Sequence, residues 1–79
     1  MRLPRDLSGE RLAQVLCSGW DYVHSHQSGS HIVLDTDKPT SHRVAIPKHS
    51  NLRIGTLNAI LRSVAEHKGV SRDAILKTL

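Results

Sequence analysis

The chain has 79 residues, enough for one modest hydrophobic core and too few for a dinucleotide-binding or kinase fold. Lysine and arginine total 11 against 7 acidic residues, and the resulting net charge of +4 favours phosphate polyanions or an acidic protein partner. Trp20 and Tyr22 are the only aromatic residues, which argues against a protein that stacks single-stranded bases on several aromatic rings.

The single cysteine, Cys17, allows no internal disulfide, as is typical of proteins from a reducing compartment. No apolar run is long enough for a membrane span, and Met1 does not open a signal segment. We therefore expect a cytoplasmic protein that has no contact with a membrane.

The first predicted element is a helix over about residues 9–18, which follows an extended lead-in at residues 1–7. Ser8 is placed to cap its first turn, and Gly19 is placed to end it. The apolar stripe of this helix is formed by Leu12, Val15 and Leu16.

Three strands are predicted next, because the apolar period changes to two from Trp20 onward. The first strand stops at a turn signal, Gln27-Ser28-Gly29. The second runs from Ser30 to Asp35 and the third from His42 to Ile46, with Pro47 ending it. Short connections between the strands favour an antiparallel meander.

The rest of the chain is predicted to be a basic loop, Lys48 to Gly55, and two helices. Thr56 is placed to cap the longer helix, which Gly69 ends, and Ser71 is placed to cap a short last helix. A small meander needs one apolar face covered, and only the helices can cover it. We therefore predict an α+β fold in a single domain over 1–79, with the helices on one face of the sheet.

His31 is the first candidate for chemistry. It alternates out of phase with Ile32 and Leu34, so it lies on the open face of the sheet if those two residues face the helices. An exposed imidazole on a rigid strand is suited to general acid–base catalysis. On periodicity alone, a surface histidine without a role explains the pattern equally well.

A second candidate for chemistry is His49. His49 follows the third strand and is placed to reach a substrate phosphate, although a loop histidine bonded to backbone is an equal alternative. His24 and His26 read as structural or incidental. We expect no metal site, because strand pairing is predicted to put His31 on the face opposite His24 and His26.

Phosphate contacts are predicted at the basic residues near the third strand. Lys48 and Arg53 lie in the loop that follows this strand, Arg43 lies on it, and Ser30 adjoins His31. Solvated surface is the preferred interpretation of the remaining basic residues on the helices: Arg62, Lys68, Arg72 and Lys77.

A set of short motifs, in order and over nearly the whole chain, closely resembles the HicA family of toxins. The motifs are Leu3-Pro4-Arg5-Asp6-Leu7-Ser8-Gly9, Gly29-Ser30-His31, Pro47-x-His49, and Gly55-Thr56-Leu57 with Ile60-Leu61. The resemblance implies a domain similar to double-stranded-RNA-binding domains, α-β-β-β-α, here with a short C-terminal helix. It also implies an endoribonuclease that cuts mRNA, is neutralised by a HicB-type antitoxin, and uses His31 as its catalytic histidine.

Metal-independent cleavage without a small-molecule cofactor is the mechanism we expect, with His31 taking the proton of a ribose 2′-hydroxyl. The general acid stays open among His49, a lysine and water. Two alternatives remain at this stage. One is a double-stranded-RNA-binding module without catalysis, and the other is a protein-interaction domain whose basic face meets an acidic partner.

Overall fold

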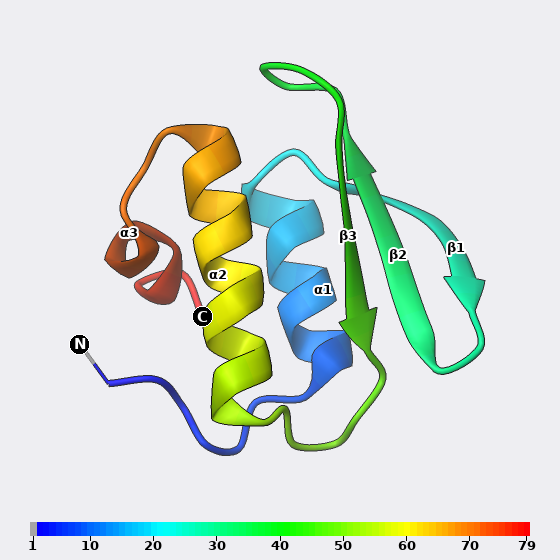
Figure 1. Cartoon of the computed structure of the whole chain (residues 1–79), viewed down its shortest axis with the longest axis vertical. Helices are drawn as coiled ribbons and strands as arrows, with labels where there is room; N and C mark the ends of the chain where they lie inside the picture. The colour runs from blue at the N-terminus through cyan, green and yellow to red at the C-terminus, as the bar shows by residue number, and fades with distance from the viewer. Residues whose placement is uncertain (1) are drawn as a thin grey trace.

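The computed structural model describes residues 2–79, which form helices and strands in the order α1–β1–β2–β3–α2–α3 (Figure 1). The helices are α1 (Gly9–Gly19), α2 (Ile54–Lys68) and α3 (Arg72–Leu76). The strands are β1 (Val23–Ser28), β2 (His31–Thr36) and β3 (His42–Pro47), which form an antiparallel sheet in the order β1-β2-β3. The predicted α+β fold, including its short last helix, is confirmed.

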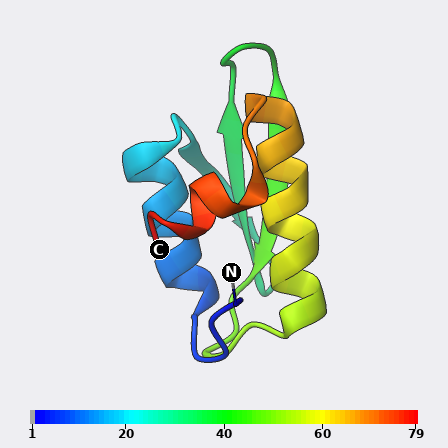
Figure 2. The same ribbon diagram turned by 90° about the vertical axis from the view of Figure 1, so that its left-hand side faces the viewer.

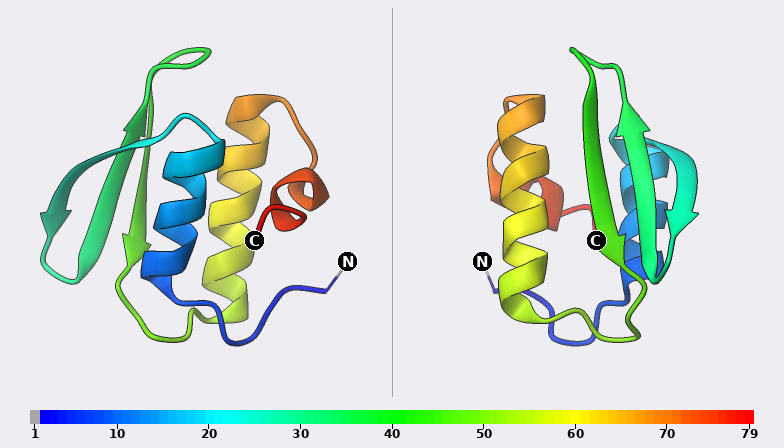
Figure 3. Two further views of the ribbon diagram at one scale, coloured as in Figure 1. Left: turned by 180° about the vertical axis from the view of Figure 1, so that it is seen from behind. Right: turned by 45° about the vertical axis from the view of Figure 1, so that its right-hand side comes forward.

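The helices form a layer on one side of the sheet. Helix α1 packs against β2 and β3, and α2 packs against β3. Figure 2 shows α3 on the outer side of this helical layer, away from the sheet. Strand β1 pairs with β2 and is exposed along its whole length, and in Figure 3 it lies at the edge of the sheet farthest from α2. The other face of the sheet is left open to solvent.

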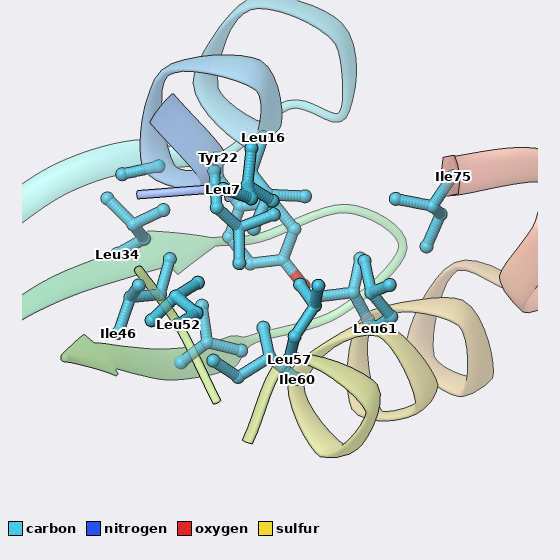
Figure 4. Packing of buried hydrophobic residues seen from close by; sticks show 14 of the residues in the cluster. Leu7, Leu16, Tyr22, Leu34, Ile46, Leu52, Leu57, Ile60, Leu61 and Ile75 are labelled. Carbon is cyan, nitrogen blue, oxygen red and sulfur yellow. The ribbon is translucent and has the colours of Figure 1, made fainter. Parts of the chain in front are cut away.

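The core lies between the sheet and the helices. Leu34 and Ile46 of the sheet, Leu16 of α1 and Leu61 of α2 are all fully buried there. Tyr22 is 1% exposed, and Figure 4 shows its ring among these aliphatic side chains. Burial raises the pKa of the Tyr22 hydroxyl to about 12.

Three of the predicted helix ends are confirmed by their hydrogen bonds. The Ser8 hydroxyl accepts a bond of 3.0 Å from the backbone N–H of Arg11, and the Ser71 hydroxyl accepts one of 3.1 Å from Ala74. Gly69 ends α2 with a φ of 70°, a left-handed conformation that glycine adopts without the steric cost of a Cβ atom.

The predicted start of α2 is wrong by three residues, and the predicted end of α1 by one. Helix α2 already begins at Ile54, with Arg53 as the N-cap residue, so Thr56 lies inside the first turn. Gly19 is the last residue of α1, and the positive φ of the connection falls on Asp21, at 62°. Aspartate adopts this conformation more readily than most residues do. Because no glycine marks the position, the sequence does not reveal it.

The alternation predicted for the first strand fails at its centre. Pairing starts at Val23, and His24 lies opposite Leu34, but His26 lies opposite Val33, so Ser25 is an extra residue in a β-bulge. A bulge shifts the phase of all later side chains. His26 therefore shares the open face with His31, and the prediction that it lies on the opposite face is wrong.

The N-terminus of α1 fixes the chain that follows β3. The backbone N–H of Gly9 donates a bond of 3.0 Å to the carbonyl of His49. A Cβ atom on Gly9 would clash with the carbonyl oxygen of Pro47, so only glycine allows this close approach of helix and strand. Residues 47 and 49 are thereby held in place next to the start of β2.

Candidate active site

His31 is placed by the turn between β1 and β2. Gly29 and Ser30 form a two-residue connection, and Gly29 has a φ of 60°. Positive φ at the first of two turn residues is the pattern of a type II′ turn, which requires glycine there. Since Ser30 completes the turn, His31 is the first residue of β2, and it is exposed.

The open face of the sheet carries His31 between Ser28 of β1 and Pro47 of β3, which are its partners in the pairing. Val33 is the next residue of β2 on this face and is only 5% exposed, because it lies between His26 and Ala45. Beyond Val33 the face carries the charged residues Asp35 and Arg43 and the exposed apolar residue Val23. The predicted position of His31 on the open face is confirmed.

His26 is oriented by its neighbour in the bulge. The Ser25 hydroxyl and the Nδ1 atom of His26 are 3.0 Å apart, which is a hydrogen bond in either direction depending on the tautomer. This contact leaves the Nε2 atom as the ring nitrogen available to a ligand. The sequence gives no warning of this arrangement, because neither residue of the bulge is a glycine or proline.

Arg43 lies at the opposite end of the open face from His31 and is paired with Asp35. Its Nε and one terminal nitrogen donate bonds of 2.7 and 3.0 Å to the two carboxylate oxygens. The Arg43 hydrogen bond lowers the pKa of the Asp35 carboxyl, and the Ser25 hydroxyl and the charge of His26 lower it further. Arg43 is therefore on the predicted face but already holds a carboxylate.

Ser30 and Lys48 continue the pairing of β2 and β3 past His31. The backbone N–H of Lys48 donates a bond of 2.7 Å to the carbonyl of Ser30. Alternation from Pro47 turns the Lys48 side chain to the helix side, where it borders a hollow with Glu10 and Gln27.

His49 and Arg53 lie in the loop beyond Lys48, and both side chains are exposed. Two of the residues predicted to contact RNA, Ser30 and Lys48, are thus close to His31, while Arg43 is not. The structure brings His49 to the same end of the sheet as His31.

A second cluster of titratable groups was missed by the sequence interpretation. Tyr22 and His42 are joined by a hydrogen bond of 2.8 Å between the hydroxyl and Nδ1, and Ser63 lies 3.2 Å from the other ring nitrogen. The ring of His67 stacks on that of His42 with centroids 4.4 Å apart. Burial, followed by the charges of His67 and Lys68, lowers the pKa of His42.

Lys68 and Arg72 are also more than solvated surface. The Lys68 ammonium lies 4.9 Å from the centroid of the Tyr22 ring and donates bonds to the Thr36 hydroxyl and the Lys38 carbonyl. Arg72 donates a bond of 2.7 Å to Asn58. These two basic residues join elements of the fold, so the surface interpretation is wrong for them.

A hollow of about 680 Å³ lies at the Arg43 end of the sheet. Three carboxylates border it, those of Asp21, Asp35 and Asp37. Their negative charges oppose the binding of an anion in this hollow, although Arg43 also borders it.

Neither a metal centre nor a membrane span is found in residues 2–79. No three histidine, cysteine, aspartate or glutamate side chains in this part of the chain gather as metal ligands would. None of its helices is long and apolar enough to cross a membrane.

Helices on one face of a three-stranded antiparallel sheet, with a histidine on the open face, define a class of small α+β domain with a polar sheet surface. The family model described as HicA toxin of bacterial toxin–antitoxin matches residues 13–65, which is more than half of the chain. The chain therefore belongs to the HicA toxin family, whose members are toxins of toxin–antitoxin systems. No curated protein and no solved structure matches the chain.

Proposed function

We propose that this toxin is an endoribonuclease that cuts mRNA and so inhibits translation. The observation that carries the proposal is the placement of His31, which the turn at Gly29 and Ser30 presents on the open face. Because the chain belongs to a toxin family, we interpret this exposed histidine as part of the toxin's activity rather than as a surface residue without a role. Its net charge of +4 favours a polyanionic substrate.

In the proposed reaction His31 accepts the proton of a ribose 2′-hydroxyl, and the resulting oxygen attacks the adjacent phosphorus. A general base needs to be exposed and to be held on a rigid element. His31 meets both requirements, because it is the exposed first residue of β2. Arg53, exposed in the loop after β3, supplies positive charge for the phosphate, with Ser30 next to His31. Lys48 adds to the positive potential at this end of the sheet from the helix side. Arg43 contacts the RNA farther along the face, and His49 supports the reaction from the loop.

The partner of the toxin is an antitoxin, and we propose that it is of the HicB type and covers the open face. Residues 1–79 act as one domain, since Ile75 and Leu76 of α3 join the same core as the sheet. The toxin meets its mRNA in the cytoplasm.

The test compares purified wild-type protein with His31→Ala on a long RNA, in the presence of a chelator. The wild type is expected to produce fragments, and the variant is expected to cleave at least about 100-fold more slowly, as loss of a general base implies. Because His31 is exposed, the variant folds, which circular dichroism checks. His24→Ala, an exposed histidine on β1, is the matched control and cleaves like the wild type.

Three results would contradict the proposal in different ways. RNA that is bound by the wild type but stays intact would favour the non-catalytic binding module. Cleavage by His31→Ala at the wild-type rate would remove this residue from the reaction. Loss of wild-type cleavage on chelation would show that the reaction needs a metal ion.

A further inference from the structure

The bulge in β1 places a second histidine on the face that carries His31. His26 is opposite Val33, and His31 is two residues before Val33 on the same side of β2. Diagonal neighbours of this kind lie about 7–8 Å apart in an antiparallel pair. Two imidazoles at this spacing can approach opposite sides of one phosphate group.

We propose that His26 is the general acid of the RNA cleavage, paired with His31 as the general base; this inference rests on the proposed function. The other open candidates are less well placed. The Lys48 side chain lies on the helix side of the sheet, where it borders a hollow with Glu10. Only the backbone of His49 is held, by the bond of its carbonyl to Gly9, and none of the hydrogen bonds among residues 2–79 orients its exposed ring.

The reaction balances between the two rings without any further reactant. His31 takes the proton of the 2′-hydroxyl, a bond forms between the 2′-oxygen and phosphorus, and the bond from phosphorus to the 5′-oxygen breaks. The Nε2–H of protonated His26 gives its proton to the departing 5′-oxygen. The products are a 2′,3′-cyclic phosphate and a 5′-hydroxyl, and exchange of protons with water restores both histidines.

Ser25 acts as a positioning residue for this step. When His26 is protonated, its Nδ1–H donates to the Ser25 hydroxyl, now 3.0 Å away, and this bond holds the ring while Nε2–H points to the substrate. The exposed position of both residues lets a phosphate reach the ring. A regular strand without the bulge would turn the His26 side chain toward the helices instead.

The experiment uses a short RNA that the wild type cuts at one place, made once with the natural 5′-oxygen and once with sulfur in its place. A thiolate leaves without being protonated, so cleavage of the sulfur substrate needs no general acid. His26→Ala is expected to cleave the natural RNA about 10²–10⁴-fold more slowly and the sulfur RNA within a few-fold of the wild type. His31→Ala is expected to be slow on both substrates, and His24→Ala to be unchanged on both.

The pH dependence gives a second readout that a structural role would not change. A general acid must be protonated, so we expect kcat/KM of the wild type to fall at high pH and His26→Ala to lose this fall. Ser25→Ala is expected to lower the rate on natural RNA less than His26→Ala does, and to leave the sulfur RNA unaffected.

Several results would overturn the inference. If His26→Ala cuts natural RNA at the wild-type rate while His31→Ala does not, His26 has no catalytic role and the proposed function stands. If His26→Ala is equally slow on both substrates, His26 does not act as the acid. If the wild type cuts neither substrate nor any longer RNA, the proposed function fails and takes this inference with it.

Discussion

His42 shows how a single residue of this chain depends on contacts between distant segments. It lies at the start of β3, yet its ring is bonded to Tyr22, which precedes β1, and to Ser63 of α2. His67 stacks on the ring, and Lys68 lies on the same side of the fold, so the nearby charges that protonated His42 would meet are positive. Folding therefore favours the neutral form of His42.

The stability of the protein is predicted to fall as the pH drops below about 6.5, the ordinary value for histidine. Because the pKa of His42 is lowered in the folded state, the unfolded chain takes up the proton first, and acid favours unfolding. Well above pH 6.5 the ring is neutral in both states, and this contribution is fully present. Urea midpoints between pH 7.5 and 5 measure the effect.

His42→Asn removes the titrating ring and keeps a polar atom near Tyr22, so it is expected to flatten this dependence on pH. His24→Asn, an exposed histidine on β1, is the control and should keep the wild-type slope. Equal slopes for wild type and His42→Asn would show that another group is responsible. This acid window is distinct from that of Asp35, whose lowered pKa makes stability fall only below about 3.8, the ordinary value for aspartate.

At the scale of the elements, the N-terminus of α2 is predicted to be less stable than it could be, because its N-cap residue belongs to the proposed RNA surface. Arg53 is the N-cap residue, with an extended backbone and no side-chain bond to the first turn. Serine at this position would accept a bond from the backbone of that turn, so Arg53→Ser is expected to raise the free energy of unfolding by about 0.5–1 kcal/mol. The same change removes a positive charge from the proposed RNA surface and is expected to weaken RNA binding.

Two measurements decide this prediction, urea unfolding and RNA binding by anisotropy in a His31→Ala background. Ser8→Ala at the N-cap of α1 is the converse control, since it removes an existing cap and should cost about 1 kcal/mol without changing RNA affinity. Tighter RNA binding by Arg53→Ser, or a loss of stability, would contradict the assignment of Arg53.

Element boundaries could be predicted from the sequence wherever a side chain makes the local contact that defines them. Ser8, Ser71 and Gly69 carry such signals, and the structure agrees with them. Arg53 carries no such signal, so the sequence predicts the N-cap of α2 at Thr56 instead. The bulge at Ser25 had no glycine or proline to reveal it, and an extra residue in β1 becomes visible only against its partner β2.

The candidate site, too, could be predicted from the sequence only in part. The open-face position of His31 followed from alternation, because β2 is regular and its neighbours Ile32 and Leu34 are buried. The position of His26 depends on the bulge, and the pairing of Arg43 with Asp35 depends on the register of β2 and β3. Register is a property of two strands together, so the sequence of either strand alone could not give it.

For the whole molecule, the arrangement of charge on the open face matters more than the net value of +4. The face carries His31 near one end and the Asp35–Arg43 pair near the other. Arg43 is 61% exposed in its side chain, so a phosphate can reach it, but that phosphate competes with a carboxylate that already forms two bonds. If RNA lies on this face as proposed, Asp35 limits how strongly this end of the sheet binds it.

Asp35→Asn is predicted to tighten RNA binding and to make it more sensitive to salt. The change frees the Arg43 guanidinium for one further phosphate, and each phosphate contact on a single strand adds about 0.7 to the slope of log K against log salt. Asp73→Asn changes the net charge by the same amount on α3, away from the open face, and is the matched control. Titrations at several salt concentrations, in a His31→Ala background that leaves the RNA intact, compare the two. A slope that rises only in Asp35→Asn places RNA along the full length of the open face, whereas equal slopes would confine it to the His31 end.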